Sequence, residues 1–158
     1  MAFYLCSGLT SIDIPSGVTS IGDFAFYQCS NLTSIVIPNG VTRIGNYALA
    51  YCSSLTSCII GSGVTRIDDG AFAYCSSLTS CIIGSGVTSI SDSAFYECSG
   101  LTSITSNATT APTITSTTFQ NVKTNGTLRV PIGSSGYDVW MGTSDYYLGL
   151  YSWTKVEQ

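Results

Sequence analysis

Four similar segments follow one another through most of the chain: LTSIDIPSGVTSIGDFAFYQCSN (9–31), LTSIVIPNGVTRIGNYALAYCSS (32–54), LTSCIIGSGVTRIDDGAFAYCSS (55–77) and LTSCIIGSGVTSISDSAFYECSG (78–100). Leucine, isoleucine, valine and cysteine recur at the same places, with a period of 23 residues. Such a period is typical of solenoids, in which a coil buries its apolar face only by stacking on its neighbours. The repeat therefore predicts a solenoid with one coil per segment.

Each segment contains two stretches with the pattern of a short strand. In L-x-x-I-x-I the last two isoleucines alternate with outward residues, so both point into the core. A glycine then turns the chain (Gly17, Gly40, Gly63, Gly86), and V-T-x-I reads as a second extended stretch. The predicted fold class is α/β: a solenoid with a parallel β-sheet on one face, short helices or turns on the other, and a C-terminal cap.

An acidic or amide residue precedes each A-F-x-x-C motif (Asp23, Asn46, Asp69, Asp92). Such residues are preferred N-caps, so they predict a helix of one or two turns at this corner. Calcium binding by the same row is a weaker interpretation, because capping accounts for the residues without an ion. Asp68 and Asp69 lie close to Arg66, which predicts local charge compensation at the surface, where it adds little stability.

Both ends of the chain depart from the regular repeat. Residues 2–8 match residues 25–31, so the chain enters in the middle of a coil, and we expect the native N-terminus to lie further upstream. After Leu101 one inserted residue restores the register, and L-R-V-P at 128–131 then predicts another strand. The predicted solenoid spans residues 1–132, and the aromatic residues of 133–158 predict a cap over its last coil.

The repeat resembles the BspA-type leucine-rich repeats of bacterial cell-surface proteins, whose pattern is L-x-x-I-x-I-P-x-x-V-x-x-I-G-x-x-A-F-x-x-C-x-x. Four complete copies match this pattern, with partial copies on either side. The resemblance implies a leucine-rich-repeat solenoid that acts as a protein-interaction or adhesion module of a surface or secreted protein. It implies an extracellular or cell-surface location and a protein ligand, such as a host extracellular protein.

Composition argues against several other classes of function. The net charge is −4 and the pI is near 4.3, so no basic surface for nucleic acid is expected. No apolar run is long enough to span a membrane, despite a mean hydropathy of +0.33. The chain has no histidine, which excludes Ser–His and Cys–His dyads. We expect no enzyme activity, no catalytic residues, no metal ligands and no cofactor.

Five of the seven cysteines follow the repeat at 23-residue intervals (Cys6, Cys29, Cys52, Cys75, Cys98), and Cys58 and Cys81 replace isoleucine on the strand. Their positions alternate with apolar residues in other coils, which predicts buried free thiols. Spacing alone leaves disulfides between neighbouring coils open.

The outward face of the predicted sheet is the candidate binding surface. It consists of a serine row beside a row of β-branched apolar residues: Ser34, Val36, Ser57, Ile59, Ser80 and Ile82. Contiguous exposed apolar residues often mark a binding site. Equally, such residues stiffen a strand, or are covered by the cap or by another copy of the chain.

Two functions of other classes remain open at this point, a structural spacer without a ligand and a carbohydrate-binding module that uses the aromatic tail. A homodimer is a further expectation. The incomplete first coil leaves Leu9, Ile12 and Ile14 uncovered, and an open strand edge favours pairing with a second chain.

Overall fold

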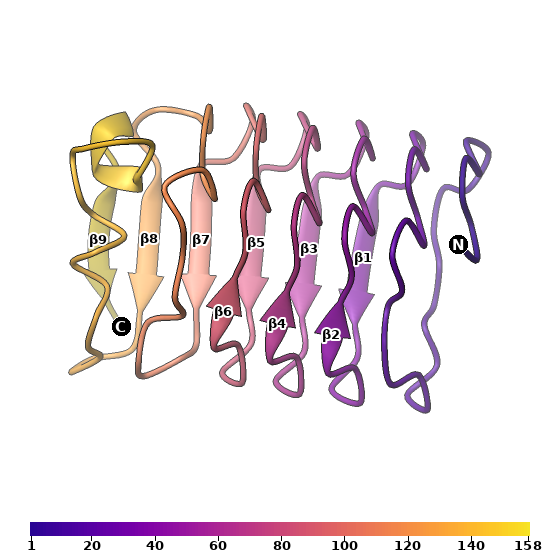
Figure 1. The fold of residues 1–158 in the computed structure, drawn as a ribbon, viewed down its shortest axis with the longest axis horizontal. Helices are drawn as coiled ribbons and strands as arrows, with labels where there is room; N and C mark the ends of the chain where they lie inside the picture. Colours follow the sequence, from indigo (N-terminus) through magenta and orange to yellow (C-terminus); the bar gives the residue numbers. More distant parts are fainter.

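The computed structural model describes residues 1–158 and shows a solenoid of stacked coils (Figure 1). The larger sheet has six strands in the order β1-β3-β5-β7-β8-β9. Its strands are β1 (Ser34–Ile37), β3 (Ser57–Ile60), β5 (Ser80–Ile83), β7 (Ser103–Ser106), β8 (Thr127–Val130) and β9 (Thr154–Glu157). The smaller sheet consists of β2 (Arg43–Ile44), β4 (Arg66–Ile67) and β6 (Ser89–Ile90). The predicted solenoid with a parallel sheet on one face is confirmed.

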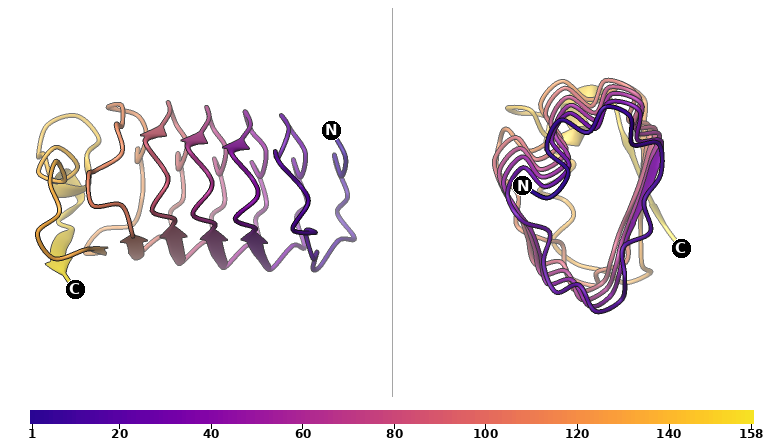
Figure 2. Two further views of the ribbon diagram at one scale, coloured as in Figure 1. Left: turned by 90° about the horizontal axis from the view of Figure 1, so that it is seen from below. Right: turned by 90° about the vertical axis from the view of Figure 1, so that its right-hand side faces the viewer.

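The strands pair in parallel at the offset that the repeat predicts. Ser34 is opposite Ser57, and Ser57 is opposite Ser80. The predicted extra strand is also confirmed, because Ile104 pairs with Leu128 across the inserted residue. Viewed along the solenoid, the repeating coils overlay closely (Figure 2), so equivalent residues form straight rows.

The corner that was predicted as a short helix consists of turns, and the chain contains no α-helix. Phe24 and Gln28 have left-handed φ values of 55° and 56°, and the equivalent residues of the next coils share this conformation. Left-handed residues interrupt the i to i−4 hydrogen bonds of a helix. Their amides donate to the next coil instead, as from Phe24 N to Asn46 O at 2.9 Å.

The predicted helix caps therefore have a different role. Asp23 Oδ1 accepts a hydrogen bond from the backbone N–H of Asn46 at 2.9 Å, and Asn46 Oδ1 accepts one from Asp69 N at 3.2 Å. These side chains join neighbouring coils and do not begin a helix. The one helical element, η1 (Leu148–Tyr151), is a 3₁₀ turn, and no helix has the length and apolar character to cross a membrane.

Stacked side chains of equivalent positions fill the interior of the solenoid. Aromatic rings form part of this core, with centroids 5.2 Å apart for Phe72 and Phe95 and 5.6 Å apart for Phe95 and Phe119. Four cysteine thiols each donate a hydrogen bond at 3.2 Å to a carbonyl of the preceding coil (Cys29, Cys52, Cys75, Cys98). The predicted burial is confirmed for six cysteines, while Cys6 in the incomplete first coil is exposed.

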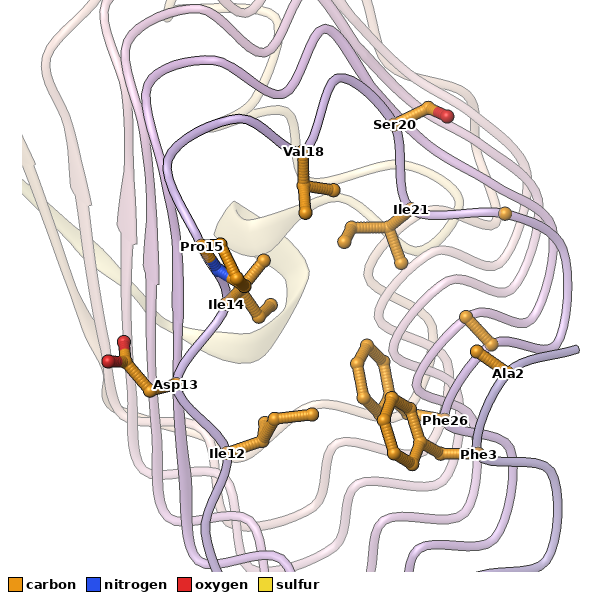
Figure 3. A pocket seen from close by; sticks show the side chains of 12 residues that line it. Ala2, Phe3, Ile12, Asp13, Ile14, Pro15, Val18, Ser20, Ile21 and Phe26 are labelled. Atoms are coloured by element: carbon orange, nitrogen blue, oxygen red, sulfur yellow. The ribbon is translucent and has the colours of Figure 1, made fainter.

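The first coil leaves the core open at the N-terminal end. Figure 3 shows Phe3, Ile12, Val18 and Phe26 pointing into a hollow of about 230 Å³, which is the uncovered end of the apolar interior. Asp13 points away from this hollow, toward the outer surface (Figure 3). The homodimer expected at this edge stays a prediction.

Residues 133–158 pack against the other end. Trp140 is buried, with its ring centroid 5.2 Å from that of Phe119, and its Nε1 donates to Pro112 O at 2.9 Å. The Tyr137 hydroxyl donates to Ala108 O at 2.9 Å. In β9 the inward positions hold Lys155 and Glu157 in place of apolar residues. These contacts support the interpretation as a cap, and the boundary between residues 132 and 133 stays a prediction.

The thiols provide a test of the stacked core. Burial, with a smaller contribution from Cys52, raises the pKa of Cys29 to about 11, and burial also raises the pKa of Cys75. Only Cys6 should react with a thiol reagent in the native protein, and the other six thiols should react after denaturation. Labelling followed by mass spectrometry of peptides measures this, and a Cys6→Ser variant should be unreactive when native. Rapid labelling of Cys29, Cys52 or Cys75 in the native protein would contradict the burial of these thiols.

The same pKa shifts predict how stability depends on pH. A folded-state pKa above the ordinary thiol value of 9.0 means that the folded protein holds these protons more tightly than the unfolded chain. The stabilisation is complete below pH 9 and is lost as pH rises toward 11. Thermal unfolding midpoints should therefore fall over this range, and a Cys29→Ala variant should show a smaller decrease.

Candidate functional site

The outward face of the six-stranded sheet brings together all six predicted site residues. Register pairs place Val36 beside Ile59 and Ile59 beside Ile82. Their exposed fractions are 56%, 43% and 37%, which is high for apolar side chains on a central sheet. The serines Ser34, Ser57 and Ser80 form a parallel row two residues away along the strands.

Alternation along each strand produces this face. In β3 the side chains of Cys58 and Ile60 are buried, so Ser57 and Ile59 between them point outward. The same pattern recurs in β1 and β5. The predicted placement of the site residues is confirmed, and their role in binding stays a prediction.

The chemistry of this face suits burial against another surface. On β1, β3 and β5 the outward residues are serines and β-branched apolar residues, none of which titrates near neutral pH. Hydroxyls can form hydrogen bonds around an apolar contact, and the apolar row gains free energy when water is removed from it.

A cluster of charged residues next to the smaller sheet was misjudged from the sequence. Asp68 was expected at the surface, but its side chain is 3% exposed. It pairs with the Arg43 guanidinium in the preceding coil and with Arg66 Nη2 at 2.8 Å, and Arg43 Nη2 also lies 3.0 Å from Asp23 Oδ1. Asp68 is thus a buried carboxylate neutralised by two half-exposed arginines, which is a structural arrangement. No group of three or more acidic, cysteine or histidine side chains is placed to hold a metal ion.

A ladder of tyrosines at the turns, with stacked and edge-to-face contacts, is not among the features expected from the sequence. The tyrosine ladder comprises Tyr4, Tyr27, Tyr51, Tyr74 and Tyr96, with ring centroids of successive members between 4.4 and 5.5 Å apart. A signal was present, because each coil up to residue 100 has a tyrosine at one or the other of two adjacent positions. The ladder was overlooked because its members are not spaced by a constant 23 residues.

The aromatic tail offers no platform for a sugar ring from its main aromatic residues. Tyr137, Trp140 and Trp153 are buried. The indole Nε1 of Trp153 donates to Lys123 O at 2.7 Å, which fixes the ring against the solenoid. A carbohydrate-binding role for these three rings is therefore not supported.

Parallel strands, a period of 23 residues and an apolar ladder led by leucine define the chain as a leucine-rich-repeat solenoid. A family model described as "BspA type Leucine rich repeat region" matches residues 1–125 with six copies, and the chain belongs to this family. Among solved structures it is similar to a leucine-rich repeat protein from Bacteroides ovatus, with 20% identity and a TM-score of 0.40. That match covers 96% of this chain and 55% of the other. No match was found among curated proteins.

The Asp68 cluster leads to a prediction about stability. Replacing both Arg43 and Arg66 by methionine leaves a buried carboxylate without a partner, so the free energy of unfolding should fall by about 3–5 kcal/mol. Adding Asp68→Ser, which introduces the residue found at the equivalent position Ser91, should recover most of this loss. Urea denaturation of the wild type, double and triple variants measures the effect. A double variant as stable as the wild type would show that the Asp68 carboxylate reaches water.

Proposed function

We propose that this chain is a protein-interaction module of a bacterial surface or secreted protein and that it binds through the outward face of its six-stranded sheet. The main observation in support of this proposal is the apolar row Val36, Ile59 and Ile82, whose side chains are in register and exposed to solvent. Membership of the BspA-type repeat family indicates a protein-interaction or structural repeat module and supports this class of function.

The form of the face favours a broad, flat protein surface as the partner. The rows are straight and β1, β3 and β5 carry no charged outward residue, so shape and apolar burial contribute more than charge to a contact with these strands. Adhesion through a protein ligand, such as a host extracellular protein, and an extracellular or cell-surface location are parts of the same proposal. We also propose that the chain binds without catalysing a reaction.

The capping role of residues 133–158 completes the proposal. A capped solenoid end keeps the last coil from exposing its core, so the sheet face remains as the accessible apolar surface at that end of the molecule. The contacts of Tyr137 and Trp140 with the preceding coil support this role.

Paired substitutions on the central strands test the binding surface. Ile59→Asp together with Ile82→Asp should reduce binding to a protein ligand by at least about a hundredfold, because two charges would have to be buried in an apolar contact. Both side chains point away from the core, so cooperative unfolding should persist. Binding to a panel of extracellular host proteins, measured by surface plasmon resonance, gives the readout.

The matched control is Ser76→Asp with Ser99→Asp, which adds the same charge at two exposed equivalent positions of the turns. This control should bind like the wild type. Binding that survives the isoleucine changes would move the site to the tyrosine ladder or another face. Absence of any ligand for the wild type would favour the structural spacer.

A further inference from the structure

A hollow of about 420 Å³ lies beside the turns of three successive coils, and we call it the turn hollow. Two rows of equivalent residues line it: Leu5, Gln28 and Tyr51 in one row, and Ser7, Ser30 and Ser53 in the other. None of these residues belongs to a strand of either sheet, so the turn hollow is separate from the face proposed above to bind a protein. Its volume falls within the about 300–1,000 Å³ of pockets that hold small molecules.

The turn hollow exists because the tyrosine ladder changes position between two coils. Tyr51 is equivalent in the repeat to Gln28 and Leu5, whereas the tyrosine of the preceding coil, Tyr27, comes one residue earlier. Leu5, Gln28 and Tyr51 share a left-handed backbone, with φ values of 60°, 56° and 61°, so their side chains leave the turn in the same direction. Leucine and glutamine are shorter than tyrosine, and space therefore remains beside the Tyr51 ring.

Neighbouring rings hold Tyr51 in place at one end of this space. Tyr74 stacks on one face of the ring, with centroids 4.4 Å apart and an interplanar angle of 10°. Tyr27 makes a T-shaped contact, with centroids 5.5 Å apart. Neither of these neighbours lines the turn hollow, which borders Tyr51 on the side of the preceding coils. The ring thus presents an aromatic surface that is already fixed, which lowers the entropy cost of binding a ligand there.

The other side chains of the turn hollow are neutral hydrogen-bonding groups, apart from Leu5. The Gln28 amide is half-buried and has no partner within the chain. Among the serines, the Ser53 hydroxyl makes only a long contact of 3.5 Å with Ser30 O. An amide and a hydroxyl can each both donate and accept hydrogen bonds. No residue that lines the turn hollow is charged.

We propose that the turn hollow binds one ring of a neutral saccharide. A pyranose ring has a face of C–H groups, which suits the negative face of an aromatic ring such as Tyr51, and hydroxyls around its rim, which suit Gln28 and the serines. A charged ligand would find no opposite charge among the lining residues. A purely apolar ligand would remove water from Gln28 and the serines without replacing the lost hydrogen bonds.

Small neutral sugars and two substitutions test the site. The wild type should bind at least one of the methyl glycosides of glucose, galactose, mannose and N-acetylglucosamine, with a dissociation constant in the millimolar range. Tyr51→Leu and Gln28→Leu, which introduce the residue of the equivalent position Leu5, should each raise that constant by at least about fivefold. Tyr51→Phe keeps the ring and should bind like the wild type. Saturation-transfer difference NMR titrations measure this, with circular dichroism to verify the fold.

Tyr47→Ser is the matched control. Tyr47 lies in the same coil as Tyr51, has a left-handed φ of 50° and is 41% exposed against 37% for Tyr51, but it does not line the turn hollow. Serine occurs at the equivalent position Ser93, so the variant should fold, and it should bind sugar like the wild type. The sheet variant Ile59→Asp with Ile82→Asp should also bind sugar like the wild type.

A free oligosaccharide and a sugar attached to a protein supply the same chemistry. Asialofetuin, which ends in galactose, and ribonuclease B, which ends in mannose, therefore extend the titrations to protein-linked sugars. Tighter binding to the glycoprotein than to its methyl glycoside, lost after enzymatic deglycosylation, would identify a protein-linked sugar. Equal affinity for both forms would identify a ligand recognised by its terminal ring alone.

Three outcomes would overturn the inference. The first is a wild type that binds none of the four methyl glycosides. The second is unchanged binding in both Tyr51→Leu and Gln28→Leu, and Gln28→Leu alone decides if Tyr51→Leu does not fold. The third is a loss in Tyr47→Ser as large as that in Tyr51→Leu, which would place the sugar outside the turn hollow.

Discussion

Backbone hydrogen bonding between neighbouring coils is the constraint on which the rest of this structure depends. At the corners the amides of left-handed residues such as Phe24 and Gln28 donate to the next coil, and on the larger sheet the strands do the same. Asp23 and Asn46 extend this pattern with side-chain acceptors. Since every coil must place its donors over the acceptors of its neighbour, the rows of side chains inside and outside the solenoid are straight.

Much of the fold was predictable because one number, the period, sets the register of every coil. The alternation of side chains on a strand then assigns each residue to the inside or the outside. The corner was not predictable in the same way, since A-F-x-x-C is compatible with both a helix turn and two left-handed residues. Hydrogen bonds to the next coil favour the two left-handed residues over the helical turn. The sequence of a single segment does not indicate these hydrogen bonds. Burial of Asp68 depends likewise on an arginine supplied by another coil.

For the candidate site, the sequence predicts which residues lie on the outward face of the sheet, but it does not predict what they contact. Six residues were assigned correctly to the outward surface, because their period-two spacing requires it. Whether a partner covers them depends on complementarity between surfaces, which no local pattern encodes.

The buried Asp68 has a consequence for how a chain of nearly identical coils finds its correct order. Looping out residues 32–54 would stack coil 55–77 directly on coil 9–31, with most apolar positions still matched. Ser20 would then replace Arg43 beside the Asp68 carboxylate, which would keep one arginine in place of two. The Asp68 Oδ2 atom would lose its donor Arg43 and be buried without a hydrogen bond, which is costly, so this skipped arrangement is disfavoured although its apolar core is almost intact. The buried Asp68 thus favours the correct order of coils over an arrangement that the repeated apolar positions alone would allow.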